Sequence, residues 1–392
     1  MKRLLLPLLM LLLLLPLSAA HAENGEGDEE RIDEGISSWL EKIELGGLED
    51  AFSALPGEIQ AVFGSGGLTK RIADAAQAAG GLDGEALSLD MKAFFLRLVK
   101  DGVGKLLFLL GAALFSAVVA ALYDGGEKGV GGTAAFVIRC MALAGTVSLY
   151  LSVVSSCAER MRGTVSFLEA AFPALVTLLT AVGGTASIAA LQPSFAFLIG
   201  TVLTTLEGVV LPLSVLSGIL GMMDPLFEKK RLSEMSKFTS KTAKWIMGAI
   251  TVAFVGTLSV KSLAAVTFDS ISIKYFKYAA QSLVPIVGGM VSGTMDTVLG
   301  CATLVKCGAG VTALSVIGVS VAYEILRVLS AAFMLRLASA LSEPVAEKRI
   351  IQMYAAASDS LNTVLAVVIA FSVALMAFVG VAALIGNVSF LA

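Results

Sequence analysis

The sequence contains little charge and almost no histidine. Of its 392 residues, 15% are charged and 57% are hydrophobic, with a mean hydropathy of +0.87, whereas soluble proteins average about 25% charged residues. The one histidine, His21, lies in a segment that we expect to be removed on export. The mature chain would then lack the histidine of a Ser-His-Asp or Cys-His triad and of histidine-ligated zinc or haem.

Other signatures of chemistry are also absent. No C-x-x-C pair occurs among the four cysteines (Cys140, Cys157, Cys301 and Cys307), and no G-x-x-x-x-G-K-[ST] nucleotide motif is present. No soluble stretch has the basic footprint of a nucleic-acid-binding protein. We therefore expect no catalytic residues, no metal site and no cofactor, and the chain is not predicted to be an enzyme.

The first 22 residues resemble a secretory signal. Lys2 and Arg3 precede an apolar run over residues 4–17, and Ala20-His21-Ala22 forms an A-x-A ending. Ala20 and Ala22 predict cleavage before Glu23. An uncleaved anchor is the alternative, and in both cases the following residues begin outside the cytoplasm.

Residues 23–105 form an acidic segment. They carry 17 acidic and 8 basic residues, for a net charge of −9. Apolar residues recur at helical spacing, and glycine-rich stretches separate the predicted helices. The apolar faces could form a self-contained helical hairpin or a docking face for a partner.

Residues 106–392 are predicted to be embedded in the lipid bilayer. Eight apolar runs are long enough to cross it: 106–123, 134–157, 167–182, 195–227, 245–260, 283–304, 311–326 and 361–385. The fold class is thus an all-α polytopic integral membrane protein with about seven to nine membrane segments, a cleavable signal peptide and an exported helical N-terminal segment.

One basic loop sets the predicted topology. Lys229, Lys230 and Arg231 should stay in the cytoplasm, so an odd number of crossings must precede them. Four runs precede the loop, and 195–227 is too long for one span. We therefore predict that this run breaks into two short helices meeting around Glu207–Pro212.

Two acids lie well inside the apolar runs. Glu207 and Asp296 would be costly in lipid, and such residues are functional candidates by default. Gly289 and Gly293 form a small-x-x-x-small pattern that favours close helix packing. The acids could alternatively cap or hydrogen-bond a neighbouring helix. A second pair, Glu324 and Arg327, is three residues apart and is expected to pair on its own helix.

Several blocks of the body resemble a known family. They include Gly184-Thr185-Ala186-Ser187 with Gln192-Pro193, Lys244-Trp245-Ile246-Met247-Gly248, the block 284–301 with its Asp296-Thr297-Val298-Leu299-Gly300-Cys301 ending, Lys306, and 338–344 with Lys348-Arg349-Ile350. Together with the signal and the acidic segment, these blocks resemble stage III sporulation protein AE of endospore-forming bacteria. The resemblance covers roughly residues 165–390, and 285–301 is its most specific part.

The resemblance implies a membrane subunit of a channel-like or secretion-like complex between mother cell and forespore. The implied partners are the other stage III sporulation proteins, the AA to AH set, and forespore protein Q. The implied location is the mother-cell membrane around the forespore. The alternative from the residues alone is a secondary transporter that couples to ions through an intramembrane acid at a broken helix.

Overall fold

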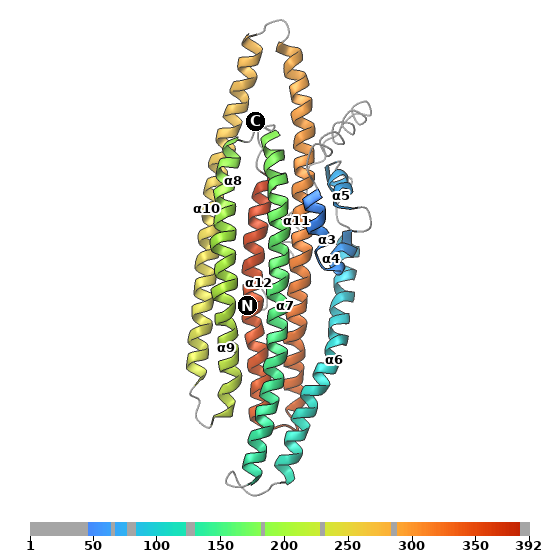
Figure 1. Cartoon of the computed structure of the whole chain (residues 1–392), viewed down its shortest axis with the longest axis vertical. Coiled ribbons are helices and arrows are strands. Elements are labelled where there is room, and N and C mark those ends of the chain that lie inside the picture. The colour runs from blue at the N-terminus through green and yellow to red at the C-terminus, as the bar shows by residue number, and fades with distance from the viewer. Residues whose placement is uncertain are drawn as a thin grey trace.

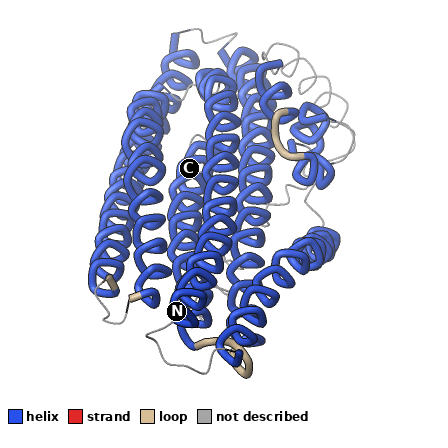
Figure 2. The backbone as a smooth tube through the Cα atoms, turned by 60° about the horizontal axis from the view of Figure 1, so that its bottom comes forward, coloured by secondary structure: helices blue, strands red, loops and turns tan. Residues whose placement is uncertain are grey.

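The protein is described by a computed structural model over residues 46–63, 67–76, 84–122, 130–181, 185–227, 232–283 and 288–384. Figure 2 shows that helices make up nearly all of these ranges, and none of them contains a strand. The predicted all-α fold is confirmed. Ala20 and Ala22, with the whole predicted signal peptide, lie outside the described residues.

Within the described ranges, three short helices precede a bundle of long ones. The short helices are α3 (Gly46–Ser53), α4 (Gly57–Phe63) and α5 (Gly67–Ala76). The long helices are α6 (Gly84–Leu122), α7 (Val130–Ala181), α10 (Ser233–Leu283), α11 (Gly288–Ser342) and α12 (Lys348–Leu384). Between α7 and α10 runs a composite helix of α8 (Thr185–Phe197), η1 (Leu198–Leu203), η2 (Leu206–Val210), α9 (Leu211–Met223) and η3 (Asp224–Leu226).

The long helices lie side by side in an elongated bundle (Figure 1). Helix α12 lies within the bundle and contacts α11, α9, α10 and α7. Its sequence is the most hydrophobic of the spanning helices, with a mean hydropathy of 2.8 over its most apolar window. Because helices keep all their backbone hydrogen bonds internal, they suit a solvent without water.

Six helices in the described ranges are long and apolar enough to cross a membrane. This number is lower than the predicted seven to nine because two pairs of predicted runs belong to single helices. Runs 134–157 and 167–182 both fall within α7, and runs 283–304 and 311–326 both fall within α11, except for their outermost residues.

The polar stretch that separates the two runs of α7 does not end the helix. Its guanidinium groups Arg160 and Arg162 form ion pairs with residues of other elements. Charges that are neutralised by neighbouring helices can remain inside a continuous bundle helix. This polar stretch is therefore a point of contact between elements, although the hydropathy pattern divided the helix into two separate apolar runs.

The predicted break at Glu207–Pro212 is wrong. The chain remains helical from Thr185 to Leu226, and it changes to π-helical hydrogen bonding over Leu198–Leu203 and Leu206–Val210. Pro212 lies in the first turn of α9, where a missing N–H is tolerated because the widened turn before it leaves room for the ring. The helix therefore continues, with π-helical turns, through the region where the sequence suggested a break.

The described helices give an odd number of passes before the basic loop, and the orientation in the membrane stays a prediction. In the described part of the chain, three helical passes (α6, α7 and the composite helix α8–α9) precede the basic loop. In Figure 1 the ends of α9 and α10 that flank this loop lie at the bottom of the bundle, and α3–α5 lie beside its upper half. The odd number arises because two predicted runs join in α7.

Candidate functional site

Helices α3–α5 pack on the bundle through one apolar face. The residues of this face are buried: Leu48, Phe52, Leu55, Ile59, Phe63, Leu68 and Ile72. Helix α5 lies against α11, and α3 lies against α7. Of the two alternatives left open by the sequence, a self-contained hairpin and a docking face, the structure shows a face that docks on the chain's own α7 and α11.

Hydrogen bonds fix the turns between these short helices. The Gln60 side chain donates to the carbonyls of Ser53 (2.8 Å) and Leu55 (2.7 Å). Arg71 donates from Nε to the carbonyl of Phe63 at 2.8 Å. These bonds cap carbonyl groups at the C-terminal ends of α3 and α4, which would otherwise have no partner. The three docked helices therefore keep a defined shape.

A network of four charged side chains lies where α4, α7 and α11 meet. The Glu58 carboxylate of α4 lies 3.9 Å from Arg160 of α7 and 3.6 Å from Arg327 of α11. Arg160 also lies 3.6 Å from the carboxylate of Glu324. Glu324 and Arg327, which were expected to pair on one helix, each form an ion pair with a different element.

The network is electrically neutral and partly dehydrated. The Glu324 side chain is only 6% exposed, whereas that of Glu58 is 44% exposed. Buried charges are tolerated only when they are paired, and two buried atoms of the network, Glu324 Oε1 and Arg327 Nε, have no hydrogen-bond partner. A cavity of about 20 Å³ borders Arg160 and Glu324, which is the size of one water site.

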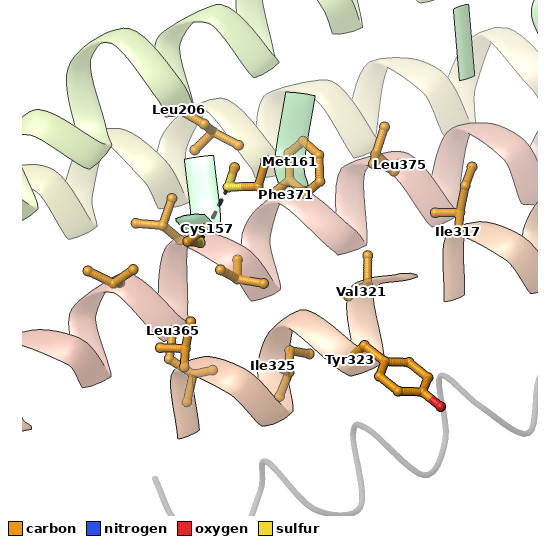
Figure 3. Close-up of a cluster of buried hydrophobic side chains, with 14 of the residues drawn as sticks. Cys157, Met161, Leu206, Ile317, Val321, Tyr323, Ile325, Leu365, Phe371 and Leu375 are labelled. Carbon is orange, nitrogen blue, oxygen red and sulfur yellow. Dashed lines mark hydrogen bonds between the residues drawn. The ribbon is translucent and has the colours of Figure 1, made fainter. Parts of the chain in front are cut away.

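Aromatic and aliphatic groups surround the charges. Arg327 lies over the Phe94 ring of α6, 5.9 Å from its centroid, and Phe94 packs edge-on against Tyr323 at 4.4 Å. Figure 3 shows a nearby cluster of buried apolar side chains, in which the Cys157 thiol lies 3.9 Å from the Met161 sulfur. The low dielectric of this setting strengthens the ion pairs.

Glu207 of the composite helix pairs with α7 on a different face from the charged network. It falls within the π-helical η2 segment, forms an ion pair with Arg162, and is 30% exposed. Because Arg160 and Arg162 are two residues apart, they point to opposite faces of α7. The middle of α7 therefore joins α4 and α11 through one arginine and the composite helix through the other.

The remaining predicted site residues lie in the first turns of α11. Gly289, Gly293 and Asp296 are helical, and the side chain of Asp296 is outside the described part of the structure. The packing role of the two glycines and the functional role of Asp296 in the membrane stay predictions. Sequence reasoning missed Glu58 and Arg160 as site residues. The charges at 159–162 inside an apolar stretch were the available signal for Arg160, and the sequence carried no comparable signal for Glu58.

Comparison with known proteins decides the family. The family model for stage III sporulation protein AE matches residues 70–387. The chain belongs to the stage III sporulation protein AE family. The resemblance inferred from the sequence is thereby confirmed, and so is a role in sporulation.

A curated relative supports this family assignment. Stage III sporulation protein AE of Bacillus subtilis (strain 168) is 28% identical over 187 residues, which are 48% of this chain and 47% of the relative. The match thus spans about half the length of each protein. No solved structure matches the chain.

The family match includes most of the charged network. Arg160, Glu324 and Arg327 lie inside residues 70–387, whereas α3 and α4 lie outside them. In this member of the stage III sporulation protein AE family, Glu58 therefore ties a preceding segment to the matched bundle.

Proposed function

We propose that the chain is a membrane subunit of a mother-cell-to-forespore channel complex. The observation that carries this proposal is the family match over residues 70–387, on a bundle with six helices suited to a membrane. The partners implied by the family resemblance are the other stage III proteins, the AA to AH set, and forespore protein Q. The location is the mother-cell membrane around the forespore.

The lengths of the helices support a role in reaching such partners. Helices α7, α10 and α11 contain 52, 51 and 55 residues. At 1.5 Å per residue they are about 75–85 Å long, whereas the hydrocarbon core is about 30 Å thick. The bundle must extend tens of ångströms beyond the lipid, which suits a component of an assembly that joins two membranes.

The distribution of basic residues supports one orientation. The helix ends that flank Lys229–Arg231, and the connection that precedes Lys348 and Arg349, lie at the end of the bundle away from α3–α5. Basic connections stay in the cytoplasm. In the proposed orientation, α3–α5 lie on the extracytoplasmic side, against the part of the bundle that faces the forespore.

The proposed role is structural rather than catalytic. The charged network pairs each carboxylate with a guanidinium and holds α4 against α7 and α11. Such pairing fixes the position of the extracytoplasmic helices, which would present a defined surface to partner proteins.

Gene replacement in the endospore-forming host tests the proposal. Deletion should arrest development after engulfment, lower the yield of heat-resistant spores and reduce late forespore reporter expression, and the wild-type copy should restore all three. Normal spore yield, or arrest before engulfment, would contradict the proposed role.

A matched pair of variants connects the structure to this test. Arg160→Gln removes the group that holds both Glu58 and Glu324, and it should lower spore yield. Glu159→Gln changes an exposed neighbour on the same helix and should leave the yield unchanged. Protein levels measured by immunoblot separate lost function from degradation.

A further inference from the structure

A second cavity opens between α6 and the end of α11. Its volume is about 250 Å³, and its lining includes Leu110, Ala113, Leu114, Leu341, Ser342 and Val345. An engineered apolar cavity of about 150 Å³ takes up benzene. The space is therefore large enough for a segment of an acyl chain.

One polar group in the lining has no partner. Ser342 is only 3% exposed, and its side-chain oxygen is buried without a hydrogen bond. The Ser342 carbonyl, in contrast, accepts hydrogen bonds from the N–H groups of Val345 (3.1 Å) and Ala346 (2.7 Å). A buried hydroxyl is costly to leave unpaired, so this cavity suits a ligand that is mostly apolar and carries an acceptor oxygen.

The surroundings of the cavity suit a lipid. Leu114, Leu341 and Val345 line it and are exposed on the outer surface, so its mouth opens on an apolar surface. The cavity also lies at the C-terminal end of the apolar segment Ala302–Ser342 of α11, so an acyl chain in it would contact mainly apolar side chains.

Positive charge lies beside the mouth. Ala346 lines the cavity, and two residues later the exposed Lys348 begins α12. Arg139 and Arg349 lie around Glu347, at 2.6 Å and 3.7 Å. With Glu343 included, the cluster has three cations and two acids. A helix N-terminus with a net positive charge favours a phosphate group.

We propose that this crevice binds one phospholipid molecule. Its acyl chain fills the space between α6 and α11, an ester oxygen accepts from the Ser342 hydroxyl, and its phosphate lies near Lys348 at the start of α12. The bound lipid joins α6 to the connection between α11 and α12, in a part of the bundle distant from the charged network.

Lipid binding to the delipidated full-length protein in detergent tests the site. The probe is dioleoyl phosphatidylglycerol, titrated and counted by native mass spectrometry. Ala113→Met and Ala346→Met each fill the cavity from a different side. Ala112→Met is the matched control, because Ala112 neighbours Ala113 on α6 and does not line the cavity.

The wild type and the control should each hold one tightly bound lipid. Both filling variants should bind it at least about tenfold more weakly, since several buried methylenes are displaced, and Lys348→Gln should weaken it about fivefold. Equal binding by both filling variants and the control, or no lipid bound by the wild type, would overturn the proposal. If Ala113→Met fails to fold, Ala346→Met decides.

Discussion

Removal of the buried charge at Glu324 should weaken the bundle more than removal of the exposed charge at Glu58. Glu324→Gln leaves Arg160 with a single carboxylate at 3.9 Å. Breaking a fully buried ion pair costs about 3–5 kcal/mol. Since Arg160 is 27% exposed and retains Glu58, we expect a smaller cost of about 2 kcal/mol, below the range for fully buried pairs.

Glu58→Gln removes two ion pairs at once, but these pairs are more exposed to water than the pair of Glu324. The Glu58 side chain is 44% exposed, and its two pairs span 3.9 Å and 3.6 Å. Exposed pairs contribute about 0.2–1 kcal/mol each, so the two together should contribute about 1 kcal/mol at low salt. The pairing of Glu58 should also weaken with added salt, whereas that of Glu324 should change little.

Thermal unfolding in detergent, followed by circular dichroism, measures the order of these effects. The apparent melting temperature should fall most for Glu324→Gln, less for Glu58→Gln, and not measurably for the control Glu159→Gln. Limited proteolysis should cleave residues 46–76 faster in both network variants. A Glu324→Gln protein as stable as the control, or more stable, would refute the assignment of a stabilising role to the network.

Two further predictions concern packing and the intramembrane acids. Gly310→Ala places a Cβ 2.5 Å from Ala383 Cβ and 3.0 Å from its Cα, which should destabilise the protein by about 1–3 kcal/mol. The control Gly111→Ala adds a Cβ in open space and should raise the melting temperature. Equal melting temperatures for the two variants would contradict the close packing of Gly310 against Ala383. Asp296→Asn and Glu207→Gln should lower spore yield at unchanged protein level if these acids take part in conduction, and a normal yield would assign them to packing alone.

The sequence was sufficient for the fold class and for the family. Low charge and long apolar runs predicted a helical membrane protein, and blocks such as 285–301 carried the family resemblance. The basic residues Lys229–Arg231 also predicted an odd number of preceding passes, and the described part of the chain has three. These features are local in sequence, so that periodicity and composition report them directly.

Features that depend on contacts between distant elements were predicted less well. The polar residues near Arg160 divided one helix into two predicted membrane segments, because hydropathy does not show that Glu58 and Glu324 neutralise that charge. Pro212 suggested a break, because the sequence does not show that a π-helical turn can accommodate it. In both cases the helix continues because tertiary packing outweighs the local preference.

The proposed place of the chain in a multiprotein complex is tested most directly by capture from sporulating cells. A functional, affinity-tagged chain would be crosslinked through residues 46–76 after engulfment and purified in detergent, with Glu58→Gln as the variant. We expect other stage III sporulation proteins to be recovered with the wild type, and less of them to be recovered with the variant. Recovery of the chain alone, from cells that complete sporulation normally, would contradict it.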